Sequence, residues 1–149
     1  MKIKAFTLIE VLVVIGIIAV LAAVVLVAVN PTRQFKLARD SQRISNMNAI
    51  LNSVQQNMSE HRGVFTCNGV VKSIPSSFTQ IKSGGGEGDI APCIVPDYLS
   101  VLPFDPVLPA KNFESVTNYD TGYEITRDVN GRITASSTGE LVPTISAMR

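Results

Sequence analysis

A long, uncharged apolar run near the N-terminus constrains this chain more than any other feature. Residues 11–29 contain no charged side chain, and Glu10 stands at the head of the run. Roughly 20 apolar residues in a helix, at about 1.5 Å each, cover the ~30 Å hydrocarbon core of a bilayer. A carboxylate in such a segment costs about 2.5–3.5 kcal/mol near the bilayer centre on insertion scales. We therefore expect Glu10 to serve a function and to be paired there with an amine of a neighbouring chain.

Two other interpretations explain part of this pattern. A secretory signal peptide has a basic start, an apolar core of about 7–15 residues and a small residue at its cleavage site. Lys2 and Lys4 fit that description, but the apolar run is too long and Glu10 interrupts its start. A plain membrane anchor explains the length and leaves Glu10 unexplained. Basic residues lie on both sides of the run, so the positive-inside rule does not settle its orientation.

Two lysines and Ala5 precede the sequence Phe6-Thr7-Leu8-Ile9-Glu10 at the head of the apolar run. This segment resembles the processing and assembly signal of type IV pilins and type II secretion pseudopilins. That signal has a short basic leader, a small residue before the cut, the sequence Phe-Thr-Leu-Ile-Glu, and then an apolar helix. The family normally has Gly before the cut, and Ala5 stands there in this chain. The residues that carry the resemblance are Lys2, Lys4, Ala5, Phe6, Thr7, Leu8, Ile9 and Glu10.

The resemblance implies a processing event and a division of the chain. A prepilin peptidase is expected to cut between Ala5 and Phe6, after which the Phe6 amine is methylated. Residues 1–5 would be the leader peptide, residues 6–30 a transmembrane and filament-core helix, and residues 31–149 a periplasmic or extracellular globular domain. The implied location is the inner membrane, crossed once, with the C-terminal domain outside the cytoplasm. In the assembled state the chain would lie in a filament.

A second apolar pattern follows the breaker Asn30-Pro31. Leu37, Ile44, Leu51 and Met58 lie seven residues apart, with Met47 and Val54 between them. This spacing predicts a helix whose apolar stripe packs on a core. We expect one helix from about Phe6 to about Arg62, bent near Pro31, with Gly63 as its stop. Asp40 interrupts the heptad pattern, so packing on the chain's own sheet is favoured over a coiled coil. Polar residues are assigned to the other helix faces, namely Arg39, Asp40, Gln42, Arg43, Asn46, Asn48 and Gln55.

The C-terminal half predicts a small antiparallel sheet. Residues 122–127 alternate in polarity, Asn130-Gly131 favours a tight turn, and residues 132–136 form the returning strand. Residues 140–145 are expected to add a third strand, and weaker strand patterns occupy residues 64–67 and 70–74. The predicted fold class is therefore α+β and pilin-like, with a long N-terminal helix packed on a small antiparallel sheet.

This half also resembles major pseudopilins and small pilins through residues 102–106 and the Tyr119 and Tyr123 pair. Major pseudopilins often bind calcium in a C-terminal loop. The candidate ligands here are Glu114, Asp120 and Asp128, but they lack the close spacing of a loop site. We interpret them as solvated surface acids and predict no metal site.

Cys67 and Cys93 are the only cysteines and would face an oxidising space. A disulfide between them is expected there, and two reduced, buried thiols are the alternative. His61, the only histidine, is interpreted as a cation near the helix C-terminus.

The sequence contains no catalytic constellation, since it has one histidine, no metal-spaced Cys/His cluster and no nucleophile motif. We predict no enzyme activity and no cofactor, and the net charge of +1 gives no reason to expect nucleic-acid binding. The favoured function is that of a structural subunit in a type IV pilus-like or type II secretion pseudopilus filament. Its expected partners are copies of itself, other pilins or pseudopilins, the prepilin peptidase, the inner-membrane assembly platform and membrane lipid. A monomeric, membrane-tethered binding domain is the alternative, and a tethered enzyme is a third.

Overall fold

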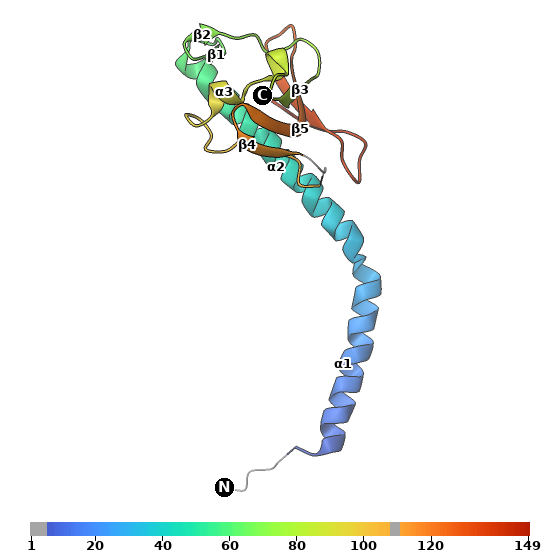
Figure 1. The fold of residues 1–149 in the computed structure, drawn as a ribbon. Coiled ribbons are helices and arrows are strands. Elements are labelled where there is room, and N and C mark those ends of the chain that lie inside the picture. The colour runs from blue at the N-terminus through green and yellow to red at the C-terminus, as the bar shows by residue number, and fades with distance from the viewer. Residues whose placement is uncertain (1–5, 108–110) are drawn as a thin grey trace. The chain divides into compact units, whose positions relative to one another are not determined.

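The computed structural model describes residues 6–107 and 111–149 and separates the chain into two units, residues 1–36 and residues 37–149. The predicted leader, residues 1–5, lies outside the described residues. The N-terminal unit contains α1 (Leu8–Val29), and α2 (Pro31–Glu60) continues the chain into the second unit (Figure 1). The long N-terminal helix and the α+β class are confirmed.

The interruption expected near Pro31 consists of a single non-helical residue. Asn30 has φ 46° and ψ 81°, the left-handed region that Asn tolerates better than most residues. Its side-chain carbonyl accepts a hydrogen bond from the Arg33 N–H at 3.2 Å, so Asn30 also caps the start of α2. Pro31 occupies the first turn of α2, where its missing N–H has no helical partner to lose.

The predicted end of the helix is confirmed. After Glu60 the chain passes through Arg62 and Gly63, both with positive φ. The Gly63 N–H donates to the Met58 carbonyl at 2.7 Å. Glycine suits this position because it has no Cβ to clash in the left-handed conformation.

Two sheets follow α2, and both are antiparallel. β1 (Thr66–Cys67) and β2 (Val70–Val71) form a short hairpin in which each strand has two residues. The larger sheet has the order β3 (Thr79–Lys82), β5 (Asn118–Arg127), β6 (Ile133–Ser137) and β7 (Ile145–Met148), and β4 (Asn112–Ser115) pairs with the start of β5. A short 3-10 turn, η1 (Gly86–Gly88), and a one-turn helix, α3 (Ala91–Ile94), lie between β3 and β4.

The hairpin predicted at Asn130-Gly131 is present. β5 and β6 pair from Glu124 opposite Ser136 to Arg127 opposite Ile133, and Gly131 has φ 86°. The prediction of a third strand at residues 140–145 is wrong. The strand β7 begins only at Ile145, and residues 140–144 form a loop. The N–H groups of Glu140 and Leu141 donate to Asp40 of α2, which leaves them unable to join a strand ladder.

The core lies between α2 and the inner face of the larger sheet. Along β5 the buried residues alternate with half-exposed ones, which sends Tyr119, Thr121, Tyr123 and Ile125 inward. From α2 the core receives Met47, Ile50, Leu51 and Val54, each with no exposed surface. The other large contributors are Phe65, Ile81, Ile90, Ile94, Leu102 and Ile133.

The predicted packing stripe of α2 is wrong in its first half. Leu37 and Ile44 are 51% and 44% exposed, whereas Asp40 and Arg43, assigned to the outer faces, are buried. The buried stripe follows a 3-4 spacing back from Val54 through Met47 to these two charges. Ion pairing offsets the cost of burying these two charges. With Asp40 and Arg43 in the core, the side chains of Leu37 and Ile44 lie partly in solvent.

Leu51 and Leu37 provide a matched pair for testing this packing. We expect Leu51→Asp to unfold residues 37–149, because truncating a buried leucine already costs about 2–5 kcal/mol and an unpaired buried charge adds to that. Leu37→Asp should change stability by about 0.5 kcal/mol or less. Thermal melting of the detergent-solubilised full chain would measure both effects. Equal loss of stability in the two variants would contradict the assigned packing face.

Candidate functional site

The start of α1 holds the Glu10 carboxylate in a reciprocal cap with Thr7. The Thr7 hydroxyl accepts from the Glu10 N–H at 3.3 Å, while Glu10 Oε2 accepts from the Thr7 N–H at 2.7 Å and from its hydroxyl at 2.8 Å. This capping box satisfies backbone donors that a helix N-terminus otherwise leaves unpaired. Both contacts of the carboxylate use Oε2, and Oε1 makes no hydrogen bond within the described part of the chain. Phe6, next to Thr7, is 84% exposed, and Ala5 lies outside the described residues.

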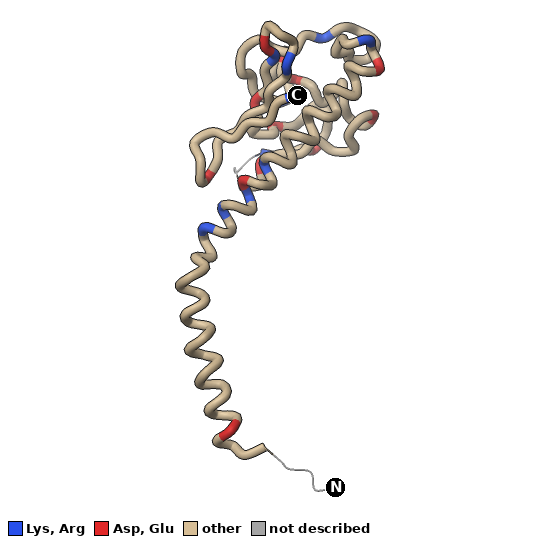
Figure 2. Tube along the Cα trace, turned by 180° about the vertical axis from the view of Figure 1, so that it is seen from behind, with Lys and Arg blue, Asp and Glu red and all other residues tan. Residues whose placement is uncertain are grey.

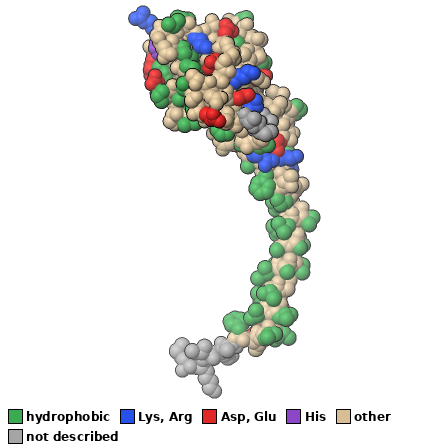
Figure 3. All heavy atoms as spheres, viewed as in Figure 1, with side chains coloured by type: hydrophobic (Ala, Val, Ile, Leu, Met, Phe, Trp, Pro, Cys, Tyr) green, Lys and Arg blue, Asp and Glu red, His purple; other side chains and the backbone are tan. Residues whose placement is uncertain are grey.

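α1 is apolar on every side. None of its 22 residues is buried, and Glu10 is its only charged residue. The tube of α1 in Figure 2 carries one red segment near its start and no blue, and green side chains follow its visible face in Figure 3. By length and composition this helix is able to cross a membrane. A helix that is hydrophobic all round requires lipid or protein around it.

A cluster of charges in the second unit ties α2 to two distant segments. Arg43 is 3% exposed, and its guanidinium bonds both Asp105 oxygens, at 2.7 and 3.1 Å, and Asp40 Oδ1 at 2.7 Å. Such a two-pronged contact is the strong form of an Arg–carboxylate pair. Hydrogen bonding to Asp105 is the main reason that the pKa of Arg43 lies above its ordinary value. Removing one member of a buried pair leaves the other charge uncompensated, at a cost of about 3–5 kcal/mol.

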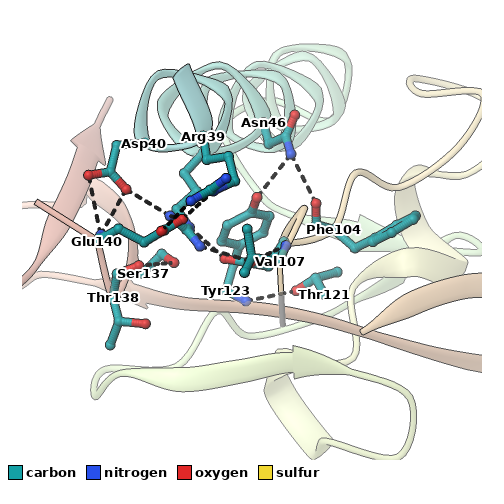
Figure 4. A network of polar contacts seen from close by, with 12 residues as sticks. Arg39, Asp40, Asn46, Phe104, Val107, Thr121, Tyr123, Ser137, Thr138 and Glu140 are labelled. Carbon is teal, nitrogen blue, oxygen red and sulfur yellow. Dashed lines mark hydrogen bonds and ion pairs between the residues drawn. The ribbon is translucent and has the colours of Figure 1, made fainter. Parts of the chain in front are cut away.

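Asp40 and Glu140 fasten the β6–β7 loop to α2. Asp40 accepts from the N–H groups of Glu140, at 2.9 and 3.2 Å, and Leu141, at 3.0 Å. Arg39 meets both oxygens of Glu140, at 2.5 and 2.6 Å. Figure 4 shows this group beneath α2, with Glu140 between Asp40 and Arg39. We call Arg39, Asp40, Arg43, Asp105 and Glu140 the ion cluster.

Both loop-fastening carboxyls have a lowered pKa. Burial disfavours the charged form of Asp40, but the N–H groups of Glu140 and Leu141 together with Arg43 outweigh it and hold its pKa below 3.8. The Arg39 side chain holds the pKa of Glu140 below 4.5.

A neutral contact extends the network toward the sheet. The Asn46 amide donates to the Tyr123 hydroxyl at 2.9 Å and to the Phe104 carbonyl at 3.0 Å (Figure 4). Burial raises the pKa of Tyr123 to about 12, so this phenol stays protonated at physiological pH.

Cys67 of β1 and Cys93 of α3 are joined by a disulfide. The buried Asn57 of α2 supports the same junction, since it exchanges hydrogen bonds with both backbone groups of Thr66 and donates to the Cys93 carbonyl. The small hairpin is thereby fixed to the C-terminal end of α2. His61 lies at that helix end, with Nδ1 2.7 Å from the Asn57 carbonyl.

The three candidate calcium ligands do not come together. Glu114 bonds Asn112 and Asn118, Asp120 pairs with Lys111 at 2.6 Å, and Asp128 pairs with Arg132 at 2.8 Å. Within the described ranges no group of three or more His, Cys, Asp or Glu side chains is arranged to hold a metal ion.

The disulfide expected between Cys67 and Cys93 is present, the assembly role of Glu10 stays a prediction, and sequence reasoning missed the ion cluster. Its signal was present in the spacing of α2, because Asp40 and Arg43 continue the 3-4 pattern of Met47, Ile50, Val54 and Asn57. A charge at a core position of such a pattern requires a partner. Asp105 and Glu140, which lie 62 and 97 residues beyond Arg43, carry no local signal of that role.

Comparison with known proteins identifies the N-terminal segment. Residues 1–26 match the prokaryotic N-terminal methylation motif, which is characteristic of type IV pilins and pseudopilins. No curated protein and no solved structure matches the chain. The motif, together with the apolar helix, supports a type IV pilin-like protein. The motif also implies processing by a prepilin peptidase and assembly with other pilins.

The ion cluster gives a pH-dependent prediction. A carboxyl whose folded pKa is depressed stabilises the fold above its ordinary pKa, and that stability is lost as the pH falls through the folded value. Asp40 and Glu140 therefore begin to lose their stabilising effect below about pH 4.5. The melting temperature should be nearly constant from pH 7 to about pH 5 and should decline at lower pH. Glu140→Gln should lower the melting temperature by a few degrees at pH 7 and by clearly less at pH 3. An equal decrease at both pH values would show that Glu140 does not act through its charge.

Proposed function

We propose that this chain is a structural subunit of a type IV pilus-like or type II secretion pseudopilus filament, assembled from the inner membrane through α1. The observation that carries the proposal is the methylation motif at residues 1–26, most of which lies in α1, a helix with no buried residue. An all-apolar helix is stable in lipid before assembly and among neighbouring helices after it. One surface thus serves both environments, and neither requires a catalytic site.

In this proposal residues 1–5 are the leader, residues 6–30 form the transmembrane and filament-core segment, and residues 31–149 form the domain outside the cytoplasm. Cleavage after Ala5 makes Phe6 the new N-terminus and creates an ammonium group four residues before Glu10. A neighbouring copy shifted along the filament axis brings its Phe6 amine to the Glu10 carboxylate. The pair neutralises two charges in an apolar core and disfavours other registers, because an unpaired charge there costs several kcal/mol.

The Thr7 cap is compatible with this pairing. Thr7 occupies only Oε2 of Glu10, so Oε1 remains available to an incoming ammonium group. The cap also holds the carboxylate against the helix start before a partner arrives. Glu10 therefore has two separable roles, as a local cap through hydrogen bonding and as a register contact through charge.

Processing is tested by the mature N-terminus. We expect mass spectrometry of the protein from its native host to find a chain that begins at Phe6 with a methylated amine. Ala5→Gly should speed the cleavage, because Gly is the family's usual residue before the cut. A mature chain that retains Met1, or that begins near Ala23 or Asn30, would contradict the proposal and favour a simple tether or a signal peptide.

Two substitutions separate the roles of Glu10. Glu10→Gln retains an amide oxygen that can complete the capping box and removes the charge, whereas Glu10→Ala removes both. Each variant is expressed together with wild type, and their ratio in sheared surface filaments is compared with the ratio in membranes. We expect both variants to be depleted from filaments by about tenfold or more, since loss of a buried charge partner exceeds 1.4 kcal/mol. If Glu10→Gln enters filaments normally, the charge of Glu10 is not an assembly contact and the residue acts only as a cap. If both variants enter normally, Glu10 has no role in assembly.

A further inference from the structure

The outer face of the larger sheet carries a polar hollow with a volume of about 360 Å³, within the range of about 300–1,000 Å³ that small-molecule pockets span. Its floor is a row across three strands, in which Glu124 of β5 lies opposite Gln80 of β3 and Ser136 of β6. Opposed residues of an antiparallel pair point to the same face of the sheet. The chain neighbours Tyr123 and Ala135 are fully buried in the core, so the row lies on the other face. We call this hollow the outer pocket.

A β-bulge opens the outer pocket beside Glu124. The register between β3 and β5 shifts at this point, and Gly122 there has φ 75°. This left-handed conformation favours glycine, which has no side chain to fill the space between Asp120 and Glu124, its neighbours on the outer face. The fold thus keeps a hollow in the middle of a long strand. Bulges are over-represented next to active sites.

Ser136 is buried in the floor of the outer pocket, yet its hydroxyl has no partner. The residue is 6% exposed, and its Oγ makes no hydrogen bond within the described residues. Every fully buried side-chain nitrogen or oxygen atom of those residues has a partner, so the Ser136 Oγ must reach the surface of the pocket that Ser136 lines. A hydroxyl that lacks a protein partner and is largely shielded from water is costly to the fold. A ligand in the pocket would supply the missing hydrogen bond.

Glu124 is a second group without a partner in the outer pocket. Its carboxylate is half-buried and makes no hydrogen bond or ion pair within the described ranges. Lys111 also lines the pocket, and its ammonium is bound to Asp120 at 2.6 Å. An anionic ligand would be repelled by the carboxylates of Glu124 and Asp120, and a cationic ligand by the ammonium of Lys111. A neutral ligand that donates hydrogen bonds to Glu124 avoids both repulsions.

The other polar groups of the pocket both donate and accept hydrogen bonds. They are the Gln80 amide, the Ser136 hydroxyl, and the hydroxyls of Thr138 and Thr144 from the β6–β7 loop. The Thr138 side chain points away from α2 (Figure 4), as a place on the outer face requires. Such groups match the hydroxyls of a sugar, because each sugar hydroxyl also donates and accepts. A carboxylate such as that of Glu124 has enough acceptor sites for two adjacent sugar hydroxyls.

We propose that the outer pocket binds a neutral hexose unit of a glycan. Glu124 accepts hydrogen bonds from two adjacent sugar hydroxyls, and the Ser136 hydroxyl gains its missing partner from the same sugar. The site lies within residues 37–149 and adds a ligand-binding function to the proposed structural one. None of the described lining residues is aromatic, so the sugar gains no stacking contact and we expect weak binding, with a Kd of roughly 1 mM.

Ligand-observed NMR on the full-length chain tests the site. The protein is solubilised in a detergent whose headgroup contains no sugar, and saturation-transfer signals are recorded with the methyl glycosides of glucose, galactose and mannose. Butylammonium and methyl phosphate are the charged probes. We expect at least one glycoside to bind and both charged probes to give weaker signals than that glycoside. The proposal is overturned if no glycoside binds, or if either charged probe gives the stronger signal.

Two substitutions locate the binding in the outer pocket. Ser136→Ala and Glu124→Gln should each weaken glycoside binding by about tenfold. Ser136→Ala should also keep the melting temperature or raise it, because it removes an unpaired hydroxyl. The control is Ser53→Ala, since Ser53 is 3% exposed but its hydroxyl donates to the Ile50 carbonyl at 2.7 Å. This control should bind the glycoside as wild type does.

Unchanged binding in both pocket variants, or equal loss of binding in the Ser53→Ala control, overturns the proposed site. The measurement uses dispersed protein in detergent and requires no filament. Its outcome is therefore independent of the proposed assembly through α1, which the Glu10 variants test.

Discussion

The helix α1 imposes the main physical constraint on this protein, because none of its 22 residues is covered by the rest of the described chain. Such a helix is unstable in water and must be surrounded by lipid or by other proteins. The rest of the chain adapts to that requirement. Residues 37–149 form a core of their own, so the globular unit does not need α1 for packing. The apolar helix is therefore free to exchange one apolar environment for another.

Within the globular unit, Arg43 connects segments that are far apart in the sequence. It joins α2 to Asp105 and, through Asp40 and Glu140, to the loop before β7. Hydrophobic contacts hold α2 on the sheet but are not directional. The ion cluster is directional, because a planar guanidinium group pairs with a carboxylate in only a few geometries. It fixes which part of the loop touches the helix, and hence which apolar side chains remain in solvent.

The sequence predicted the features that depend on local pattern, namely the long N-terminal helix, its stop at Gly63 and the turn at Gly131. It failed where distant residues decide the outcome. The heptad pattern favoured Leu37 and Ile44 as core residues, but pairing with Asp105 and Glu140 made burial of Asp40 and Arg43 acceptable instead. The N–H groups of Glu140 and Leu141 donate to the buried Asp40, which keeps these two residues out of the strand predicted there. The role of Glu10 stays a prediction, which rests on the cost of a lone carboxylate in an apolar run. The Thr7 cap follows a local signature in the sequence, a Thr three residues before a Glu.

The capping box at the start of α1 and the ion cluster on α2 are both held by contacts within the chain. Thr7 holds one oxygen of Glu10, and the ion cluster pairs its own charges. Within the described residues, exposed apolar side chains follow the whole length of α1. Association through such surfaces is favourable but carries little specificity of its own. In the proposed filament, Glu10 Oε1 gains a partner only in one arrangement of neighbours, so this carboxylate would decide the register.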